Sequence, residues 1–253
     1  MIQEVSGAEL YYERHGSGDP VICLHNFSNK SRALFGPLVP FLAQEYTLHL
    51  VDLRGHGRST HDEGVWSHER VASDIVELMA GLGLGSAYFL AACSGSMAML
   101  RVAREHPELV RAMVVDSSSH KVPESAHRLY KSPADLEPKW KAYYEAANEV
   151  YGARYGPVLA QIFYDMRLPE CDINIPLSWL REITTPILLL AGDRDKFFPP
   201  EVPQEMARLL PNAELLMFQE TGHIVMDFYP ERVARLAAEF FRTHQQPPES
   251  TDN

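Results

Sequence analysis

Residues Ala87–Glu108 read AYFLAACSGSMAMLRVAREHPE, and this stretch decides the fold. Its first six residues are apolar and of strand length, and helical spacing is clear from Met97 to Glu105. Only small residues, Cys93 to Ser96, lie between the two patterns. A buried strand that turns abruptly into a helix can hold a nucleophile at the tip, because the strained turn tolerates only small flanking residues.

The same alternation of apolar runs and helix-period segments continues in both directions along the chain. It predicts an α/β protein, with a mostly parallel, twisted sheet flanked by helices. The further strands are predicted over Leu10–Arg14, Val21–His25, Thr47–Asp52, Val110–Asp116, Ile187–Gly192 and Ala213–Phe218, and further helices over Val71–Leu82 and Glu231–Arg242.

One segment interrupts this alternation, since residues 120–184 contain helix-period stretches rich in aromatic residues but no strand-like run. We expect a helical cap over residues 120–184, inserted into a core formed by residues 1–119 and 185–244. The polar, proline-rich residues 245–253 are expected to be disordered. Most cap aromatics can be explained by packing between cap helices; those predicted to contact a substrate are Tyr130, Trp140, Tyr144 and Phe163.

Composition excludes several classes of protein. The 253 residues carry a formal net charge of −11, which disfavours nucleic acid and anionic membrane surfaces as partners. Neither a signal peptide nor a run of about 20 apolar residues is apparent, so a cytoplasmic protein is expected. The three cysteines lack CxxC spacing and the histidines lack an HExxH-like grouping, so no metal is expected.

Two neighbouring residues compete for the tip of the turn. If Ser94 is the nucleophile, alanine and serine stand two places either side, and both glycines of the G-x-S-x-G pattern are missing. If Cys93 is the nucleophile, the flanking residues are Ala91 and Gly95, so one glycine is kept and the other is replaced by the next smallest residue. The flanking residues therefore favour Cys93.

The residues after the turn support the same choice through a family resemblance. Residues 105–108 read EHPE, which resembles the end of the corresponding helix in the α/β-hydrolase superfamily. Compared with that family without a gap, the nucleophile falls on Cys93, whereas Ser94 requires a one-residue deletion. A cysteine at this position is similar to the dienelactone-hydrolase branch and to some acyl-transferring relatives.

Two later turns resemble the other parts of the family's catalytic triad. The GDRD stretch that ends at Asp195 follows a predicted strand, and the TGH stretch ends at His223. The resemblance implies that Asp195 is the acid and His223 the base, in the family order of nucleophile, acid and histidine. Asp193 is expected to support the turn, and Asp116 is a second possible acid position.

The segment His25-Asn26-Phe27 stands where the family usually has His-Gly-x. The resemblance implies that the backbone N–H groups of Phe27 and Ser94 form the oxyanion hole, with Phe27 also contacting substrate. Asn26 departs from the family glycine, although asparagine tolerates a left-handed backbone better than most residues.

A fourth landmark is the loop of residues 52–59, DLRGHGRS, which closely resembles the family's D-x-R-G-x-G-x-S loop. Asp52 and Arg54 are expected to form ion pairs rather than to act in catalysis. Four landmarks in the family order make the resemblance specific, and it covers nearly the whole chain outside the cap and the tail.

The resemblance implies a cofactor-free hydrolase that acts on an ester, thioester or lactone of a small, partly apolar or aromatic acyl substrate. Cys93 would form an acyl-enzyme intermediate, with His223 as the base. An acyltransferase or a cyclase would use the same triad, whereas a lyase would need His223 but not Cys93. A non-enzymatic ligand receptor is disfavoured, because a receptor could lose the acid or the histidine, whereas both are present in this sequence. The sequence leaves the oligomeric state open.

Overall fold

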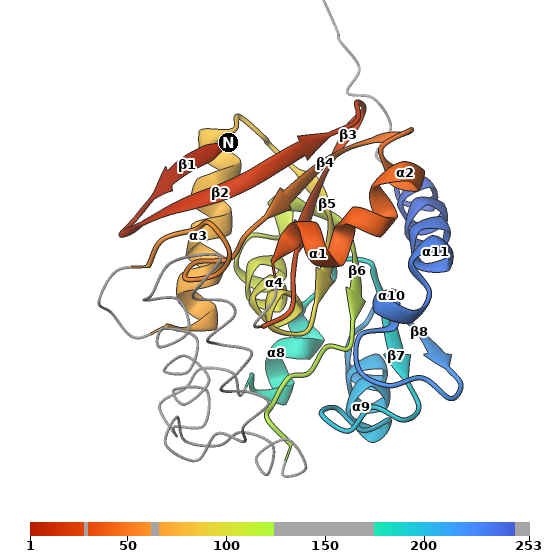
Figure 1. Ribbon diagram of the computed structural model, residues 1–253. Helices are drawn as coiled ribbons and strands as arrows, with labels where there is room; N and C mark the ends of the chain where they lie inside the picture. Colours follow the sequence, from red (N-terminus) through yellow and green to blue (C-terminus); the bar gives the residue numbers. More distant parts are fainter. Residues whose placement is uncertain (28–29, 62–65, 124–174, 246–253) are drawn as a thin grey trace, which may run out of the picture.

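The computed structural model describes residues 1–27, 30–61, 66–123 and 175–245, which form one eight-stranded sheet with helices on both faces (Figure 1). The strand order is β1-β2-β4-β3-β5-β6-β7-β8, and the first two pairings are antiparallel, whereas all the others are parallel. The strands are β1 (Ile2–Val5), β2 (Ala8–His15), β3 (Asp19–Leu24), β4 (Tyr46–Val51), β5 (Ala87–Ala92), β6 (Val110–Asp116), β7 (Ile187–Gly192) and β8 (Ala213–Phe218). The predicted fold class is confirmed.

Two helical layers cover the sheet. Helices α3 and α4 pack against each other on one face, while α2 and α11 pack together on the other face (Figure 1). The helices of the described residues are α1 (Ser31–Phe35), α2 (Val39–Leu42), α3 (His68–Gly81), α4 (Ser94–Glu105), α8 (Leu177–Glu182), α9 (Glu201–Leu209), α10 (Val225–Phe228) and α11 (Pro230–Thr243), with short 3-10 turns at Gly36–Leu38 and Pro107–Leu109.

The central strands show why the parallel part of the sheet could be predicted. Every residue of β4, β5 and β7 is buried, because helices cover both faces of a parallel sheet. Strand β1 was not predicted, since it is a four-residue edge strand with only two partly buried residues. The short helices α1 and α2 were missed for a similar reason, because so few residues give no clear helical period.

The start of α4 corrects one sequence-based boundary. Helical spacing predicted that this helix begins at Met97, whereas it begins at Ser94, immediately after Cys93. Small residues of the first turn give no hydrophobic period, so the pattern marks the helix only from its first large apolar side chain. The consequence is functional, because the amino end of α4 lies directly at the tip of the turn.

The loop of residues 52–59 is held by two separate buried carboxylates. Arg54 forms an ion pair with Asp74 of α3, with nitrogen–oxygen distances of 2.8 and 2.6 Å, so this part of the expectation is met. Contrary to the expectation, Asp52 forms no ion pair within the described part of the chain. Its carboxylate instead accepts hydrogen bonds from the N–H and hydroxyl of Ser31 and from the N–H of Arg58.

The Arg54–Asp74 pair gives a prediction about stability. Both side chains are almost completely buried, so Arg54→Ala leaves an uncompensated carboxylate in the interior. We expect the free energy of unfolding to fall by about 3–5 kcal/mol, measured by urea denaturation. Arg242→Ala removes the exposed partner of Glu45 and serves as the control, with little change expected. Equal, small losses in both variants would contradict a structural role for the buried pair.

Two sequence-based boundaries fall on parts of the chain that the structure describes incompletely. Of the predicted cap, only residues 120–123 and 175–184 are described, and the predicted disordered tail beyond residue 245 lies outside the described residues. Among the helices described here, none is sufficiently long and apolar to cross a membrane.

Candidate active site

The predicted catalytic residues follow the carboxyl ends of parallel strands. Cys93 comes directly after β5, Asp195 follows β7, and His223 follows β8. Parallel strands end at the same edge of the sheet, so residues that are 130 positions apart in the chain meet there. The topology therefore brings Cys93, His223 and Asp195 together.

Cys93 occupies the tip of the turn between β5 and α4. Its backbone has φ 45° and ψ −114°, an uncommon conformation for a residue other than glycine. Hydrogen bonds on both sides hold the turn, since the Cys93 N–H donates to the Asp116 carbonyl at 2.9 Å and the Cys93 carbonyl accepts from the Met97 N–H at 3.0 Å. The strained residue is thus Cys93 and not Ser94, which is the first residue of α4.

Gly95 explains why one glycine of the elbow pattern is present. A Cβ atom at this position would lie 2.5 Å from the Leu24 carbonyl oxygen and 2.8 Å from that of His25. Backbone atoms cannot move aside for such a contact, so only glycine lets α4 begin this close to the end of β3. Gly95 therefore stands two residues after the tip of the turn, as expected if Cys93 is the nucleophile.

The Ser94 side chain points to a different partner. Its hydroxyl is buried and lies 3.3 Å from Nε2 of His68, whose ring packs edge-on against Trp66 at 4.9 Å. His68 begins α3, so this contact joins the amino ends of two helices. Sequence reasoning did not identify His68, because nothing in its local pattern distinguishes it from an ordinary helix residue.

His223 and Asp195, the predicted base and acid, form a hydrogen-bonded pair. Nδ1 of His223 lies 2.7 Å from Oδ2 of Asp195, and the other carboxylate oxygen accepts the backbone N–H groups of Phe197 and Phe198 at 2.8 and 3.0 Å. The rings of Phe197 and Phe198 both contact the imidazole of His223, with ring-centroid distances of 4.8 and 5.3 Å. The carboxylate is therefore fixed in orientation, and it fixes the imidazole in turn.

Electrostatic interactions favour a protonated His223. Burial lowers its pKa, but the charge and hydrogen bond of Cys93, together with those of Asp195, outweigh burial and raise the pKa to about 10. The imidazole thus interacts with the sulfur of Cys93 on one side and with the Asp195 carboxylate on the other. This arrangement can pass a proton between a thiol and a histidine whose tautomer is set by the acid.

Asp116, the alternative acid, has a different set of contacts. Its carboxylate accepts the backbone N–H groups of Val225 and Met226 at 3.0 and 2.8 Å, and the Ser117 hydroxyl at 3.0 Å. Burial raises the pKa of Asp116 to about 6, and the three hydrogen bonds counteract that rise only in part. Asp116 therefore anchors the short helix that follows His223.

Asp193 also supports a turn near the site. Its Oδ1 accepts the backbone N–H of Thr221 at 3.1 Å, two residues before His223. A Cβ at the neighbouring Gly192 would lie 2.3 Å from the Thr221 carbonyl oxygen, so the two loops touch through their backbones. Hydrogen bonds thus hold the loop that carries His223 both before the histidine, through Asp193, and after it, through Asp116.

Backbone strain gathers around these residues. In the part of the chain that the structure describes, the non-glycine residues with positive φ are Cys93, Ser117, Glu220 and Ile224. Ile224 follows His223 directly, and its N–H donates to the Ser117 hydroxyl at 3.0 Å. Such conformations cost free energy and persist where neighbouring contacts enforce them, a pattern that is common at functional sites.

The end of β3 forms the other side of the site. The Leu53 N–H donates to Nε2 of His25 at 2.9 Å, so Nδ1 carries the proton and donates to the Asn26 carbonyl at 2.7 Å. Burial lowers the pKa of His25, in keeping with a neutral ring. Phe27 is buried as well, and its ring packs edge-on against that of His56, with the ring centroids 5.2 Å apart. His25 thereby holds the segment that carries the predicted oxyanion donor.

The remaining predicted site residues can be placed only in part. The four aromatics expected to contact substrate, which are Tyr130, Trp140, Tyr144 and Phe163, lie outside the described residues. Within the described ranges, no group of three or more His, Cys, Asp or Glu side chains is arranged to hold a metal ion.

Comparison with known proteins identifies the class to which this fold and site belong. The chain is a member of the α/β-hydrolase fold family, whose model matches residues 19–166 and 139–230. The resemblance to this superfamily and the assignment to its hydrolases are therefore confirmed at that level.

Individual relatives are distant but cover most of the chain. The putative carbamate hydrolase RutD of Stutzerimonas stutzeri is 25% identical over 271 residues, which cover 90% of this chain and 100% of RutD. The human serine hydrolase BPHL is 25% identical, covering 94% of this chain and 84% of its own length. The enol-lactonase of Burkholderia xenovorans is 17% identical with a TM-score of 0.77, covering 96% of this chain and all of the lactonase.

Proposed function

We propose that the protein hydrolyses an ester, thioester or lactone of a small, partly apolar or aromatic acyl group through an acyl-cysteine intermediate. Cys93 is the nucleophile, His223 the base and Asp195 the acid that orients it. The observation that carries this proposal is that the strained turn at Cys93 and the hydrogen-bonded pair His223–Asp195 follow the carboxyl ends of parallel strands and so lie at the same edge of the sheet.

The chemistry of the site suits a thiol better than it suits a hydroxyl. A thiol gives up its proton to a neighbouring imidazole more readily than a hydroxyl does, and Cys93 lies directly before the amino end of α4. The interactions with Cys93 and Asp195 that raise the pKa of His223 support its role as the group that accepts this proton. The attacking sulfur forms a bond to the acyl carbon, the alcohol or thiol leaves with the proton from His223, and water then releases the acid.

The negative charge that develops on the carbonyl oxygen needs backbone donors. We assign this role to the N–H groups of Ser94 and Phe27, with Phe27 also bordering the substrate. Support comes from the close approach of α4 to β3 at Gly95 and from the hydrogen bonds of His25, which order the segment before Phe27. Preorganised donors of this kind are a large part of catalysis in acyl transfer.

The substrate class is inferred from the relatives and from the predicted cap. One relative is an enol-lactonase and another a putative carbamate hydrolase, so carbonyl compounds with a good leaving group are the common chemistry. Aromatic residues of the predicted cap would supply an apolar pocket. We include Tyr130, Trp140, Tyr144 and Phe163 in this proposal on the basis of the sequence alone.

Intact-protein mass spectrometry tests the nucleophile directly. The protein is exposed briefly to a panel of acyl thioesters, activated esters and enol lactones, beside the variants Cys93→Ala and Ser94→Ala. We expect the wild type and Ser94→Ala to gain the acyl mass and Cys93→Ala to gain none. Cys23 gives no background, because it is fully buried in β3 and burial raises the pKa of its thiol.

Two other outcomes would contradict the proposal. Loss of labelling in Ser94→Ala but not in Cys93→Ala would make the protein an ordinary serine hydrolase. Labelling that survives in both variants would show reaction at another residue. Hydroxylamine sensitivity of the adduct adds a second test, since a thioester is cleaved more readily than an oxygen ester.

A further inference from the structure

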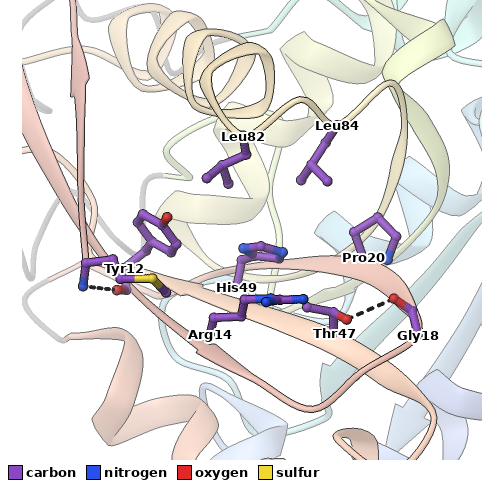
Figure 2. Close-up of a pocket in the computed structure, with 9 residues that line it drawn as sticks. Tyr12, Arg14, Gly18, Pro20, Thr47, His49, Leu82 and Leu84 are labelled. Atoms are coloured by element: carbon purple, nitrogen blue, oxygen red, sulfur yellow. Dashed lines mark hydrogen bonds between the residues drawn. The ribbon is translucent and has the colours of Figure 1, made fainter.

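A pocket lies on the same face of the sheet as α3, near the amino ends of the parallel strands β3 and β4 (Figure 2). Its volume is about 360 Å³, within the range of small-molecule sites. Because Cys93 and His223 follow the carboxyl ends of their strands, this pocket is separate from the proposed active site.

Arginine and histidine side chains lie side by side on the two strands that form the floor of this pocket. Arg14 of β2 is directly paired with His49 of β4 in the antiparallel register. The Arg14 side chain is exposed, and among the residues that the structure describes no carboxylate pairs with it. No acidic residue lines the pocket within those ranges either. A guanidinium without a counter-ion is therefore available to a ligand.

His49 supplies a second polar group. The residue is only 5% exposed, and its Nδ1 is buried without a hydrogen-bond partner in the described part of the chain. Burial, with the nearby charge of Arg14, lowers the pKa of His49, so the ring is neutral at pH 7 and offers one N–H donor. Because His49 lines the pocket, its imidazole can contribute this donor beside the Arg14 guanidinium.

The opposite wall is apolar. Leu82 and Leu84, from the segment after α3, point toward His49 in Figure 2, and the Tyr12 ring lies on the same side of the sheet. The ring centroids of Tyr12 and His49 are 6.0 Å apart. One end of the pocket therefore presents hydrogen-bond donors and the rest presents hydrocarbon and aromatic surface.

We propose that this pocket binds a small monocarboxylate with an apolar body, and that this binding is independent of the reaction at Cys93. The carboxylate is held by Arg14, whose planar fork matches two oxygens, and by the imidazole of His49. The apolar body lies against Leu82 and Leu84. Since the whole chain carries a net charge of −11, long-range attraction cannot gather anions, and recognition depends on these local donors.

Benzoate is the probe, and benzamide, which has the same shape without the charge, is the matched control ligand. Binding to the full chain is measured by isothermal titration calorimetry for the wild type, Arg14→Gln and Arg208→Gln. Arg208 is an exposed arginine of α9, far along the chain and outside the pocket, and its replacement changes the net charge equally.

We expect the wild type and Arg208→Gln to bind benzoate with the same Kd, on the order of 1 mM, and Arg14→Gln to bind at least ~10-fold more weakly. Benzamide is expected to bind each of the three proteins at least as weakly as benzoate binds Arg14→Gln. In amide NMR spectra, benzoate should shift the signals of Arg14 and His49 and leave that of Ser94 unchanged.

Three outcomes would overturn this proposal. If benzoate did not bind to the wild type, the pocket would not be a carboxylate site. Equal binding to all three proteins, with shifts at Ser94, would place the carboxylate in the active site instead. Benzamide binding as tightly as benzoate would show an apolar cavity without anion recognition. None of these results bears on acylation of Cys93, so the two proposals fail separately.

Discussion

Cys93→Ala is expected to lower kcat for ester or thioester hydrolysis by roughly 10³-fold or more, as removal of a nucleophile does in related triads. The substrate is taken from those that acylate the wild type, and the rate is followed by release of the leaving group. The loss follows from the geometry, since Cys93 is the residue at the strained tip of the turn and lies at the same edge of the sheet as His223. Cys93→Ser should reduce hydrolysis without abolishing it, because the hydroxyl is a weaker nucleophile in this setting.

Ser94→Ala is the matched control for this experiment. It removes the hydroxyl that lies near His68 but keeps the backbone N–H assigned to the oxyanion hole, so most of the activity should remain. A Cys93→Ala variant that stays fully active while His223→Ala is inactive would contradict covalent catalysis. That result would favour a lyase, which needs the base but not the thiol. Indifference to both changes would favour a ligand receptor.

Asp195→Asn is expected to lower kcat on the order of 10⁴-fold, the effect seen when a triad acid is made neutral. The structure gives a specific reason. Two backbone N–H groups, from Phe197 and Phe198, bind one oxygen of Asp195, so an asparagine would keep its carbonyl there and turn its NH₂ toward His223. Nδ1 of His223 would then accept, and Nε2 would carry the proton and could not act as a base. Steady-state kinetics and thermal unfolding measure the two consequences separately.

Asp116→Asn is the matched comparison, because it makes the same chemical change at the alternative acid position. Its carboxylate binds the N–H groups of Val225 and Met226, so the new NH₂ would face a backbone donor. We expect a stability loss of about 1–3 kcal/mol and a much smaller loss of kcat. If Asp116→Asn abolished activity while Asp195→Asn retained it, the acid would be Asp116.

Much of the core could be predicted from the order of apolar runs. Strands β5, β6, β7 and β8 have the bounds that the sequence predicts, because each is a short, mostly apolar segment of strand length. Edge strand β1 and the first turn of α4 were missed, since both lack a run of large apolar side chains. The local pattern is thus informative where large apolar side chains follow one another closely in the sequence.

The networks that position the site could not be predicted in the same way. His68 meets Ser94 across 26 residues, and Val225 meets Asp116 across 109. Neither contact leaves a trace in local periodicity, because each depends on how loops from separate strands approach at the sheet edge. Arg14 and His49 likewise form one pocket only through the pairing of β2 with β4.

The sequence by itself determined the family, the parallel core and a short set of candidates for nucleophile, acid and base, because these depend on hydrophobic runs and on residue types at fixed local spacings. Only the tertiary structure decided which candidates share one site. Backbone dihedral angles distinguish Cys93 from Ser94 as the residue at the tip. Hydrogen bonds across 28 residues pair His223 with Asp195 and leave Asp116 to anchor the following helix. Such contacts arise from packing of the whole sheet, and no local stretch of the chain encodes them.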